Sequence, residues 1–490
     1  MSEARPNIVV IVMDTARADA FSSKEPSLTP NFDTLSSTGT AYSRSFSVSP
    51  WTLPSHASLF TGMVPSKHGA HAGHKRLEQE HERLPAVLSD AGYQTVAVSN
   101  NTWLSEEFGF ARGFDTFRKN WQYIQSDVDL GTIARTEEGL DKLRSVAARI
   151  FDGNPLINTA NAVYGQFVRK RAEDDGAQST NDWIRDWLAR REQTDPFFLF
   201  VNYLEPHLEY KPPREHAVPL LPEDVSYNEA MAVNQDAWQY IAKKADMSER
   251  DFEILEALYQ AEISYLDERI GELKELLQEE GEWKDTIFIL TGDHGENIGE
   301  HRLMDHQYCL YETLLHVPLV IHGREFTGGG TVDELIQLTD LVPTLLDAVD
   351  IDAPGFREQL QARSFYPAAD TASREYVVAE YMAPQPSMEA LEGRVGEIPD
   401  PVYKYNRSLR AIRTDRWKLI RGSDGSVELY NIENDPGETT DCSGDKEEIR
   451  RELADDLDDW LDSFDRTEYS DGVRMKEGTK QRLEDLGYLQ

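Results

Sequence analysis

The chain has 490 residues, of which 88 are acidic and 50 are basic, so its formal net charge at pH 7 is −38. This excess of negative charge excludes a general nucleic-acid binder and a polybasic membrane-surface protein, because both need basic side chains to contact phosphates. A hydrophobic content of 39% with alternating apolar segments also excludes a disordered chain. The acidic residues are spread along the whole chain and arginine outnumbers lysine. This pattern favours a halophilic protein that stays soluble in high salt, and an ordinary acidic protein is the alternative.

The sequence offers little that would direct the chain to a membrane. No segment has 18 consecutive apolar residues, so we expect no membrane insertion. The apolar run near the N-terminus is short and ends at Asp14, unlike a signal peptide, so we expect a cytoplasmic protein. With only Cys309 and Cys442, a disulfide framework or a cysteine-rich metal site is excluded.

Predicted strands and helices alternate along most of the chain. In chain order, the predicted strands are residues 7–13, 95–98, 197–201, 286–290 and 317–321, and the predicted helices are residues 31–37, 84–91, 252–277 and 339–348. The first strand is an unbroken apolar run, as expected for a parallel strand that is buried on both faces. The alternation predicts an α/β fold with a mostly parallel central sheet flanked by helices.

Two parts of the chain differ from this pattern. Residues 126–195 are more polar and helical, which predicts an insertion or lid over the sheet. Near the C-terminus the pattern predicts a small antiparallel sheet, an acidic helix and a polar tail, at residues 374–381, 409–413, 417–421, 427–430, 446–464 and 471–490. We therefore divide the chain into a catalytic domain, residues 1–400, and a C-terminal subdomain, residues 401–490.

Side chains that can bind metals follow three of the predicted strands. Asp14 ends the first strand, and Asp293 and His294 follow the strand at residues 286–290. Glu205 and His207 follow another strand. Ligands of open α/β sheets collect at the carboxyl ends of the strands, where carboxylates and imidazole together suit a divalent cation. One such carboxylate would usually be a helix cap, but three clusters at one edge predict a metal site.

Residues 49–62 hold the best candidate nucleophile. Pro54 suits the first turn of a helix and Gly62 suits its end, so Thr52 is expected just before the helix. There its hydroxyl would face free backbone N–H groups and the positive end of the helix dipole, which can stabilise an oxyanion. The alternative is that Thr52 or Ser55 is only an N-cap, and the spacing leaves both interpretations open.

These motifs, taken in order over nearly the whole chain, resemble the sulfatase family of the alkaline-phosphatase superfamily. The resemblance rests on residues 6–7, 14–19, 29–31, 52–56, 61–62, 67–69, 113–115, 292–296, 299–301, 311–312, 316–319, 413–418, 429–431 and 435–438. It implies the alkaline-phosphatase-like α/β fold, with a small C-terminal antiparallel sheet and helix, and metal-dependent hydrolysis of phosphate or sulfate esters.

The resemblance also implies one divalent metal ion, held by Asp14, Asp293 and His294 with Thr52 as a further ligand. Thr15 stands where the family usually has a second Asp, so a hydroxyl or a water would take that place. Typical sulfatases use Ca²⁺ and phosphoester relatives use Mn²⁺ or Zn²⁺. The missing carboxylate favours a transition metal, and the choice among Ca, Mn, Mg and Zn stays open.

The nucleophile motif departs from the family pattern of Cys or Ser, any residue, Pro, Ser and Arg. Thr52 takes its first place and His56 its last. In sulfatases the Cys or Ser is oxidised to the aldehyde formylglycine, whereas the methyl group on a threonine Cβ would lead to a ketone. An unmodified Thr52 alkoxide that forms a covalent intermediate is therefore expected, which favours phosphodiesters. Sulfate-ester hydrolysis, transfer of a phosphoryl-linked group to a glycan or lipid, and a non-catalytic binding protein are the alternatives.

Five further residues are expected at the substrate. The resemblance places His207 and His306 in the substrate site, and His306 lies near the position of a substrate-binding Lys in sulfatases. We expect His56, His207 and His306 to bind substrate oxygens or to protonate the leaving group. Lys67 and Asn100 are candidate substrate contacts, although Asn101 ends the same strand and could take the place of Asn100. The expected partner is a small-molecule or glycan ester, not a nucleic acid.

Overall fold

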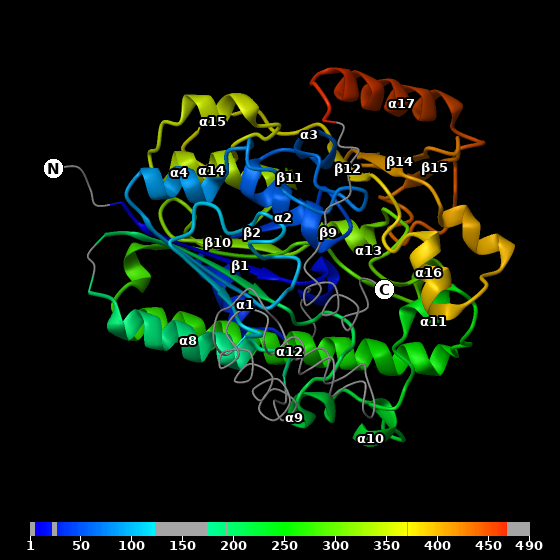
Figure 1. Ribbon diagram of the computed structural model, residues 1–490, viewed down its shortest axis with the longest axis horizontal. Coiled ribbons are helices and arrows are strands. Elements are labelled where there is room, and N and C mark those ends of the chain that lie inside the picture. Colours follow the sequence, from blue (N-terminus) through cyan, green and yellow to red (C-terminus); the bar gives the residue numbers. More distant parts are fainter. Residues whose placement is uncertain (1–4, 22–26, 123–173, 193–194, 370, 468–490) are drawn as a thin grey trace, which may run out of the picture.

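The computed structural model describes residues 5–21, 27–122, 174–192, 195–369 and 371–467 (Figure 1). Within these residues the centre of the fold is one nine-stranded sheet in the order β11-β2-β10-β6-β1-β5-β3-β4, with β9 paired to β2. Its strands are β1 (Asn7–Met13), β2 (Thr40–Phe46), β3 (Gln94–Ser99), β4 (Thr116–Lys119), β5 (Phe197–Tyr203), β6 (Thr286–Gly292), β9 (His316–Val317), β10 (Leu319–His322) and β11 (Thr331–Gln337).

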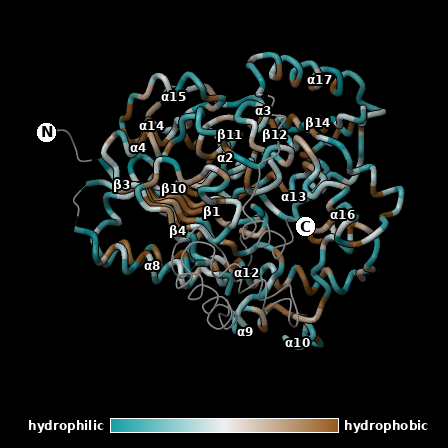
Figure 2. Tube along the Cα trace, in the orientation of Figure 1, coloured by the Kyte–Doolittle hydropathy of each residue, from teal (hydrophilic) through white to brown (hydrophobic). Residues whose placement is uncertain are grey.

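The three middle strands form the apolar core and fix the position of the chemistry. All residues of β1, β5 and β6 are buried, and the brown segments of Figure 2 gather along this sheet. Both neighbours run parallel to β1, and Met13 lies opposite Tyr203 and Gly292 in the register. Because these strands end at the same level, Asp14 and Asp293 leave the sheet side by side.

Helices cover both faces of the sheet (Figure 1). One face packs against α1 (Pro30–Thr38), α8 (Ala177–Arg190) and the long α12 (Glu249–Glu279). The other face carries α2 (Thr52–Thr61), α4 (Leu84–Asp90), α14 (Leu341–Ala348) and α15 (Pro354–Gln359). Ser248 begins α12 with a capping box that includes Asp251, which satisfies the first free N–H groups of the helix.

Short elements connect these layers. They are α3 (Pro65–His68), α9 (Arg214–Ala217), α10 (Tyr227–Ala230), α11 (Ala237–Ile241), α13 (Glu312–Leu315), α16 (Met388–Val395), β7 (Asn297–Ile298) and β8 (Met304–Asp305). The predicted strand at 317–321 is interrupted by Pro318, which cannot donate to the ladder, so it forms β9 and β10. Strand β10 pairs antiparallel with both β6 and β2, and the sheet is otherwise mostly parallel, as predicted.

The small antiparallel sheet is confirmed and consists of β12 (Val377–Tyr381), β13 (Leu409–Arg413), β14 (Trp417–Gly422) and β15 (Val427–Asn431). Helix α17 (Glu447–Asp462) covers it through Leu453, Leu457 and Leu461, at the upper right of Figure 1. Strand β12 joins this sheet although it precedes residue 401, and the division of the chain at residue 400 stays a prediction.

A buried ion-pair cluster ties the small sheet to the rest of the molecule. Lys418 of β14 is fully buried, and its amine lies 3.1 Å from Glu312 of α13 and 2.8 Å from Glu438. Arg413 of β13 contacts Glu312 at 3.4 Å. These residues belong to the motifs that carry the family resemblance, and their contacts join the small sheet to α13.

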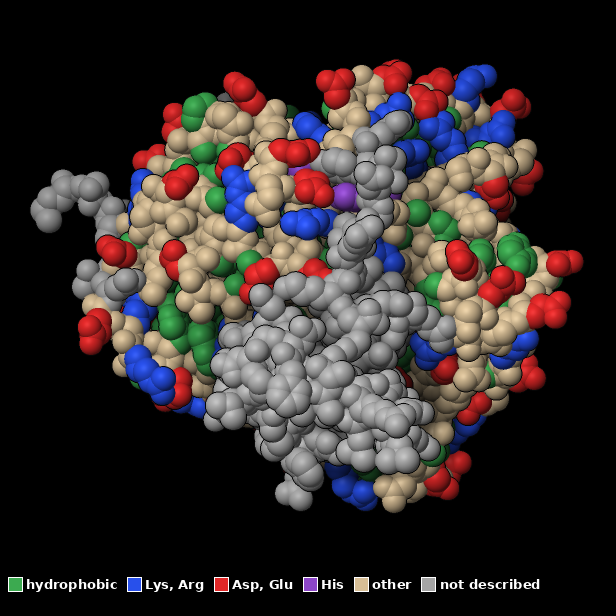
Figure 3. Space-filling model, in the orientation of Figure 1, with side chains coloured by type: hydrophobic (Ala, Val, Ile, Leu, Met, Phe, Trp, Pro, Cys, Tyr) green, Lys and Arg blue, Asp and Glu red, His purple; other side chains and the backbone are tan. Residues whose placement is uncertain are grey.

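Most of the predicted insertion at residues 126–195 lies outside the described residues, as does the tail at 471–490. The described part of the insertion includes α8, and the lid role stays a prediction. Asp and Glu side chains are scattered over the face drawn in Figure 3 rather than gathered in one patch. None of the described helices combines the length and apolar character that a membrane span requires.

Candidate active site

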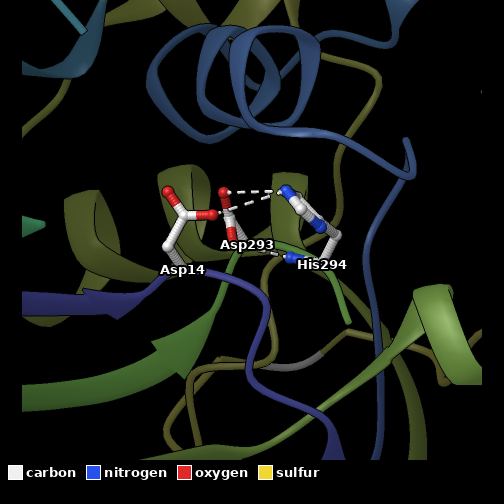
Figure 4. Close-up of side chains that lie close together, drawn as sticks. All are labelled: Asp14, Asp293 and His294. Carbon is white, nitrogen blue, oxygen red and sulfur yellow. Dashed lines mark hydrogen bonds and ion pairs between the residues drawn. The ribbon is translucent and has the colours of Figure 1, made fainter. Parts of the chain in front are cut away.

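The ends of adjacent strands bring three predicted metal ligands together. Asp14 follows β1, Asp293 and His294 follow β6, and their side chains face one another (Figure 4). Nε2 of His294 lies 3.7 Å from Oδ1 of Asp14 and 3.4 Å from Oδ2 of Asp293, and the three side chains are at most 1% exposed. Their ligand atoms all lie within 4.8 Å of one another. The structure thus groups Asp14, Asp293 and His294, whereas Glu205 accepts hydrogen bonds from the backbone N–H groups of Asp175 and Ala177 at 3.1 and 3.0 Å.

The donor set fits a divalent cation. Burial raises the pKa of Asp14 to about 7 and the pKa of Asp293 well above its usual range, so both carboxylates need a positive charge to stay ionised. Oδ2 of Asp293 is buried and has no hydrogen-bond partner among the described residues. Nδ1 of His294 donates to the carbonyl of Gly295 at 2.9 Å, which leaves the Nε2 lone pair facing the carboxylates. Burial also lowers the pKa of His294, so its ring stays in the neutral form that binds metals.

Thr15 offers a further oxygen at this edge. Its backbone is in the left-handed region with φ of 63°, which is strained for a β-branched residue. In this conformation its N–H donates to Oδ1 of Asp293 at 3.2 Å. Its Oγ1 is buried and unpartnered among the described residues. The position where the family usually has a second Asp therefore holds a backbone donor and a buried hydroxyl.

Thr52 is the first residue of α2, so the helix begins one residue earlier than expected and includes Thr52. The N-cap is Trp51, and no side chain caps this end of the helix. The hydroxyl of Thr52 instead lies 3.5 Å from Oδ1 of Asp14 and 3.4 Å from Nε2 of His294. Ser55 donates to the carbonyl of Asp293 at 2.7 Å. Neither residue is an N-cap, and Thr52 points at the candidate metal ligands.

Asn101, rather than Asn100, reaches this site from the end of β3. Its amide donates to Oδ2 of Asp14 at 2.6 Å and lies 3.3 Å from Oγ1 of Thr52. The amide of Asn100 instead donates to Thr180 of α8 at 3.0 Å and to the carbonyl of Asn202 at 3.3 Å. Both residues follow the same strand, so the sequence predicts that one of them reaches the site. Only the structure shows which of the two side chains turns inward.

His56 lies on α2 one turn after Thr52. Its Nδ1 donates to the carbonyl of Thr52 at 2.9 Å and lies 3.4 Å from Oδ2 of Asp293. Its ring packs edge-on against Phe200 of β5, with the centroids 5.8 Å apart. Burial lowers the pKa of His56 to about 4, so the ring is neutral near pH 7. His56 therefore holds the start of α2 against the sheet.

His207 and His306 extend the site beyond His294. The ring of His306 lies 4.6 Å from that of His294 and 5.2 Å from that of His207, measured between centroids. Burial acts to lower the pKa of His306, but Asp305 and Glu296 raise it to about 10. Its Nδ1 pairs with Asp305 and lies 3.5 Å from Oε1 of Glu296. Burial lowers the pKa of His207 to about 4, so the site contains one imidazolium beside neutral imidazoles.

The structure does not bring Lys67 to the same place. Its amine donates to the carbonyl of Gln359 at 2.7 Å. Among the described residues, none of its hydrogen bonds or ion pairs involves Asp14, Thr52 or His294. The predicted contact between Lys67 and substrate stays a prediction.

Comparison with known proteins identifies the family. The family model described as Sulfatase matches residues 6–351. The chain belongs to the sulfatase family. It is 25% identical over 467 residues to an arylsulfatase of Clostridium perfringens, covering 90% of this chain and 91% of the relative. It is 24% identical to the choline-sulfatase of Rhizobium meliloti, covering 90% and 83% of the two chains.

Solved structures of similar fold include enzymes for two kinds of ester. The phosphonate monoester hydrolase of Agrobacterium radiobacter superposes with a TM-score of 0.69 at 20% identity, covering 94% of this chain and 96% of that one. A 2-O GAG sulfatase superposes with a TM-score of 0.66 at 19% identity, covering 95% of both chains. These likenesses confirm the alkaline-phosphatase-like fold. The protein is thus a hydrolase of the sulfatase family, a family that typically binds a divalent metal.

Proposed function

We propose that this enzyme hydrolyses phosphodiesters with Thr52 as its nucleophile. The observation that carries the proposal is the position of the Thr52 hydroxyl. It is buried at the start of α2, between Oδ1 of Asp14 and Nε2 of His294. Asn101 donates to the same oxygen, which directs the hydroxyl proton towards the carboxylate or the imidazole nitrogen. This arrangement suits deprotonation of the Thr52 hydroxyl to an alkoxide nucleophile.

The candidate metal residues are Asp14, Asp293, His294 and Thr52. A bound divalent cation would lower the pKa of the Thr52 hydroxyl and offset the negative charge of the ester. The start of α2 contributes backbone N–H groups without intrahelical partners, which suit the charge that develops on the non-bridging oxygens.

The reaction then has two displacement steps. The oxygen of Thr52 attacks phosphorus in line, the P–O bond to the first alcohol breaks, and a phosphothreonine ester forms. The imidazolium of His306 is placed to bind an anionic oxygen or to give its proton to the leaving alcohol, with His207 beside it. Water attacks the phosphorus of the intermediate and restores the Thr52 hydroxyl. The products are an alcohol and a phosphomonoester.

Threonine is also the reason for preferring phosphorus to sulfur. Oxidation of Thr52 would give a ketone rather than an aldehyde, so the hydrate-based release of sulfate has no equivalent here. A phosphothreonine can be opened by attack at phosphorus. Sulfate-ester hydrolysis is the competing function, since the curated relatives are named arylsulfatase and choline-sulfatase. One solved neighbour is described in complex with D-glucosamine-2-N,6-O-disulfate, which supports a glycan ester as the class of substrate.

A rate panel tests the proposal. Nitrophenyl phosphodiester, phosphomonoester, phosphonate and sulfate are compared in multimolar KCl with Ca²⁺, Mg²⁺, Mn²⁺ or Zn²⁺. Wild type, Thr52→Ala and Thr52→Ser are measured. We expect the phosphodiester to react fastest, Thr52→Ala to lose at least about 1,000-fold in kcat, and Thr52→Ser to keep most activity. Full turnover by Thr52→Ala, or dominant turnover of the sulfate, would contradict it.

A further inference from the structure

Lys75 is a half-buried lysine that lacks an acidic partner. Its Nζ lies 5.5 Å from the ring centroid of Trp103. Within the described residues no hydrogen bond or ion pair of Lys75 is found, although the chain has 88 acidic side chains. Burial lowers the pKa of its ammonium group to about 8, as expected for a cation that is not next to a carboxylate. A cation–π contact alone holds this charge in place.

Trp103 connects Lys75 to the nucleophile by two routes. Its ring is fully buried and packs edge-on against Trp51, with centroids 5.5 Å apart, and Trp51 directly precedes Thr52. Its backbone N–H donates to Oδ1 of Asn101 at 2.9 Å, and the amide of Asn101 reaches Thr52. Lys75 is therefore connected to Thr52 through one layer of aromatic rings and through the amide of Asn101.

Lys75 differs from the other charged groups near the site because its positive charge has no acidic partner among the described residues. In the described part of the chain, no Lys or Arg makes a hydrogen bond or ion pair with the side chain of Asp14, Thr52, Asp293 or His294. His306 is itself paired with Asp305 and lies 3.5 Å from Glu296. A substrate with more than one negative group finds an uncompensated positive charge at Lys75.

We propose that Lys75 binds a second anionic group of the substrate, a carboxylate, sulfate or phosphate carried at a distance from the reacting ester. The inference rests on the proposed function only in taking an anionic ester as substrate. The anion would supply the partner that Lys75 lacks, while Trp103 keeps the lysine stem in one position. Lys75 thereby selects polyanionic substrates over those with a single negative charge.

Two synthetic esters test this role. They share one nitrophenyl leaving group and one reacting phosphodiester, and only one of them carries a carboxylate on the retained alcohol. The proteins are wild type, Lys75→Met, Lys75→Arg and Lys274→Met. Lys274 is a matched control, because its Nζ also lies 5.5 Å from a tryptophan ring, that of Trp283. Trp283 precedes β6 and so lies at the opposite edge of the sheet from Asp293.

We expect Lys75→Met to lower kcat/KM for the carboxylate ester about tenfold or more, mainly through KM, and to leave the ester without the carboxylate within about twofold. Lys75→Arg should retain the preference, and Lys274→Met should change neither ester. Equal losses on both esters, or no loss, would overturn the proposal.

A second pair consists of nitrophenyl sulfates, in which one member carries the carboxylate on the nitrophenyl group because a sulfate monoester has no retained alcohol, and the preference is computed within each series. Dominant sulfate turnover then contradicts the phosphodiester proposal without deciding the role of Lys75. If neither series is turned over, affinities of the same esters for proteins carrying Thr52→Ala are measured by calorimetry. A selective loss of affinity for the carboxylate ester on Lys75→Met supports the role, and any other result overturns it.

Discussion

Replacing Lys418 by Met should destabilise the protein strongly, because it leaves two buried carboxylates without their cation. The Lys418 amine lies 2.8 Å from Glu438 and 3.1 Å from Glu312. At an effective dielectric constant of about 20, each contact is worth about 5–6 kcal/mol before desolvation is subtracted. Removing one partner from a buried ion pair costs about 3–5 kcal/mol net. Because Arg413 still contacts Glu312 at 3.4 Å, we expect about 3 kcal/mol.

Urea unfolding followed by tryptophan fluorescence measures this loss, at low and at multimolar KCl. The matched control is Arg416→Met, which breaks the pair of Arg416 with Glu433 at 3.2 Å, where the side chains are 56% and 63% exposed. That exposed pair should contribute less than about 1 kcal/mol and should weaken with salt, whereas the loss at Lys418 should persist in salt. Adding Glu438→Gln to Lys418→Met should recover part of the stability. A loss at Lys418 no larger than at Arg416 would refute the reasoning.

Three further predictions concern the site and its support. Asn101→Ala should lower kcat at least about tenfold, since it removes the donor to Asp14 and Thr52. Asn100→Ala should have a much smaller effect. Steady-state kinetics measures both variants, and the metal content of each protein serves as the control. A chelator should abolish turnover and lower the unfolding midpoint, and a divalent cation should restore both; unchanged activity in metal-free protein would contradict the site. Burial raises the pKa of Asp267 from 3.8 to about 6. Protonation of this carboxyl therefore stabilises the fold fully below pH 3.8, and this stabilisation is lost as the pH rises through 6. Asp267→Asn should remove that part of the pH dependence in urea titrations between pH 4 and 7. If the unfolding free energies of wild type and variant changed with pH in parallel, the interpretation would be wrong.

The grouping of Asp14, Asp293 and His294 was predictable because each follows a point where an apolar strand gives way to polar residues. The apolar run of β1 ends at Asp14, and β6 ends before Asp293 and His294. Parallel strands in register deliver such residues to one edge, so their convergence followed from the order of apolar and polar residues alone. Thr52 was found in the same way, from proline and glycine at the two ends of α2.

Other features depend on contacts that sequence patterns do not encode. Asn100 and Asn101 are equivalent in sequence, and the backbone path after β3 decides which amide faces Thr52. In strand β11 the first four residues are exposed or half-buried and the last three are buried, so the strand lacks the alternation that would have predicted it from the sequence. Glu312 and Lys418 belong to the motifs that carry the family resemblance, and only the structure shows that they pair between α13 and the small sheet.

Helix α2 is enclosed on every side, with all ten of its residues buried, including Thr52 at its start. The hydroxyl of Thr52, the proposed nucleophile, cannot move independently, because any displacement would require the packed core to move with it. Substitutions along α2 that loosen the core should cost activity before the fold is lost, and the temperature at which turnover ceases should coincide with the melting of the central sheet.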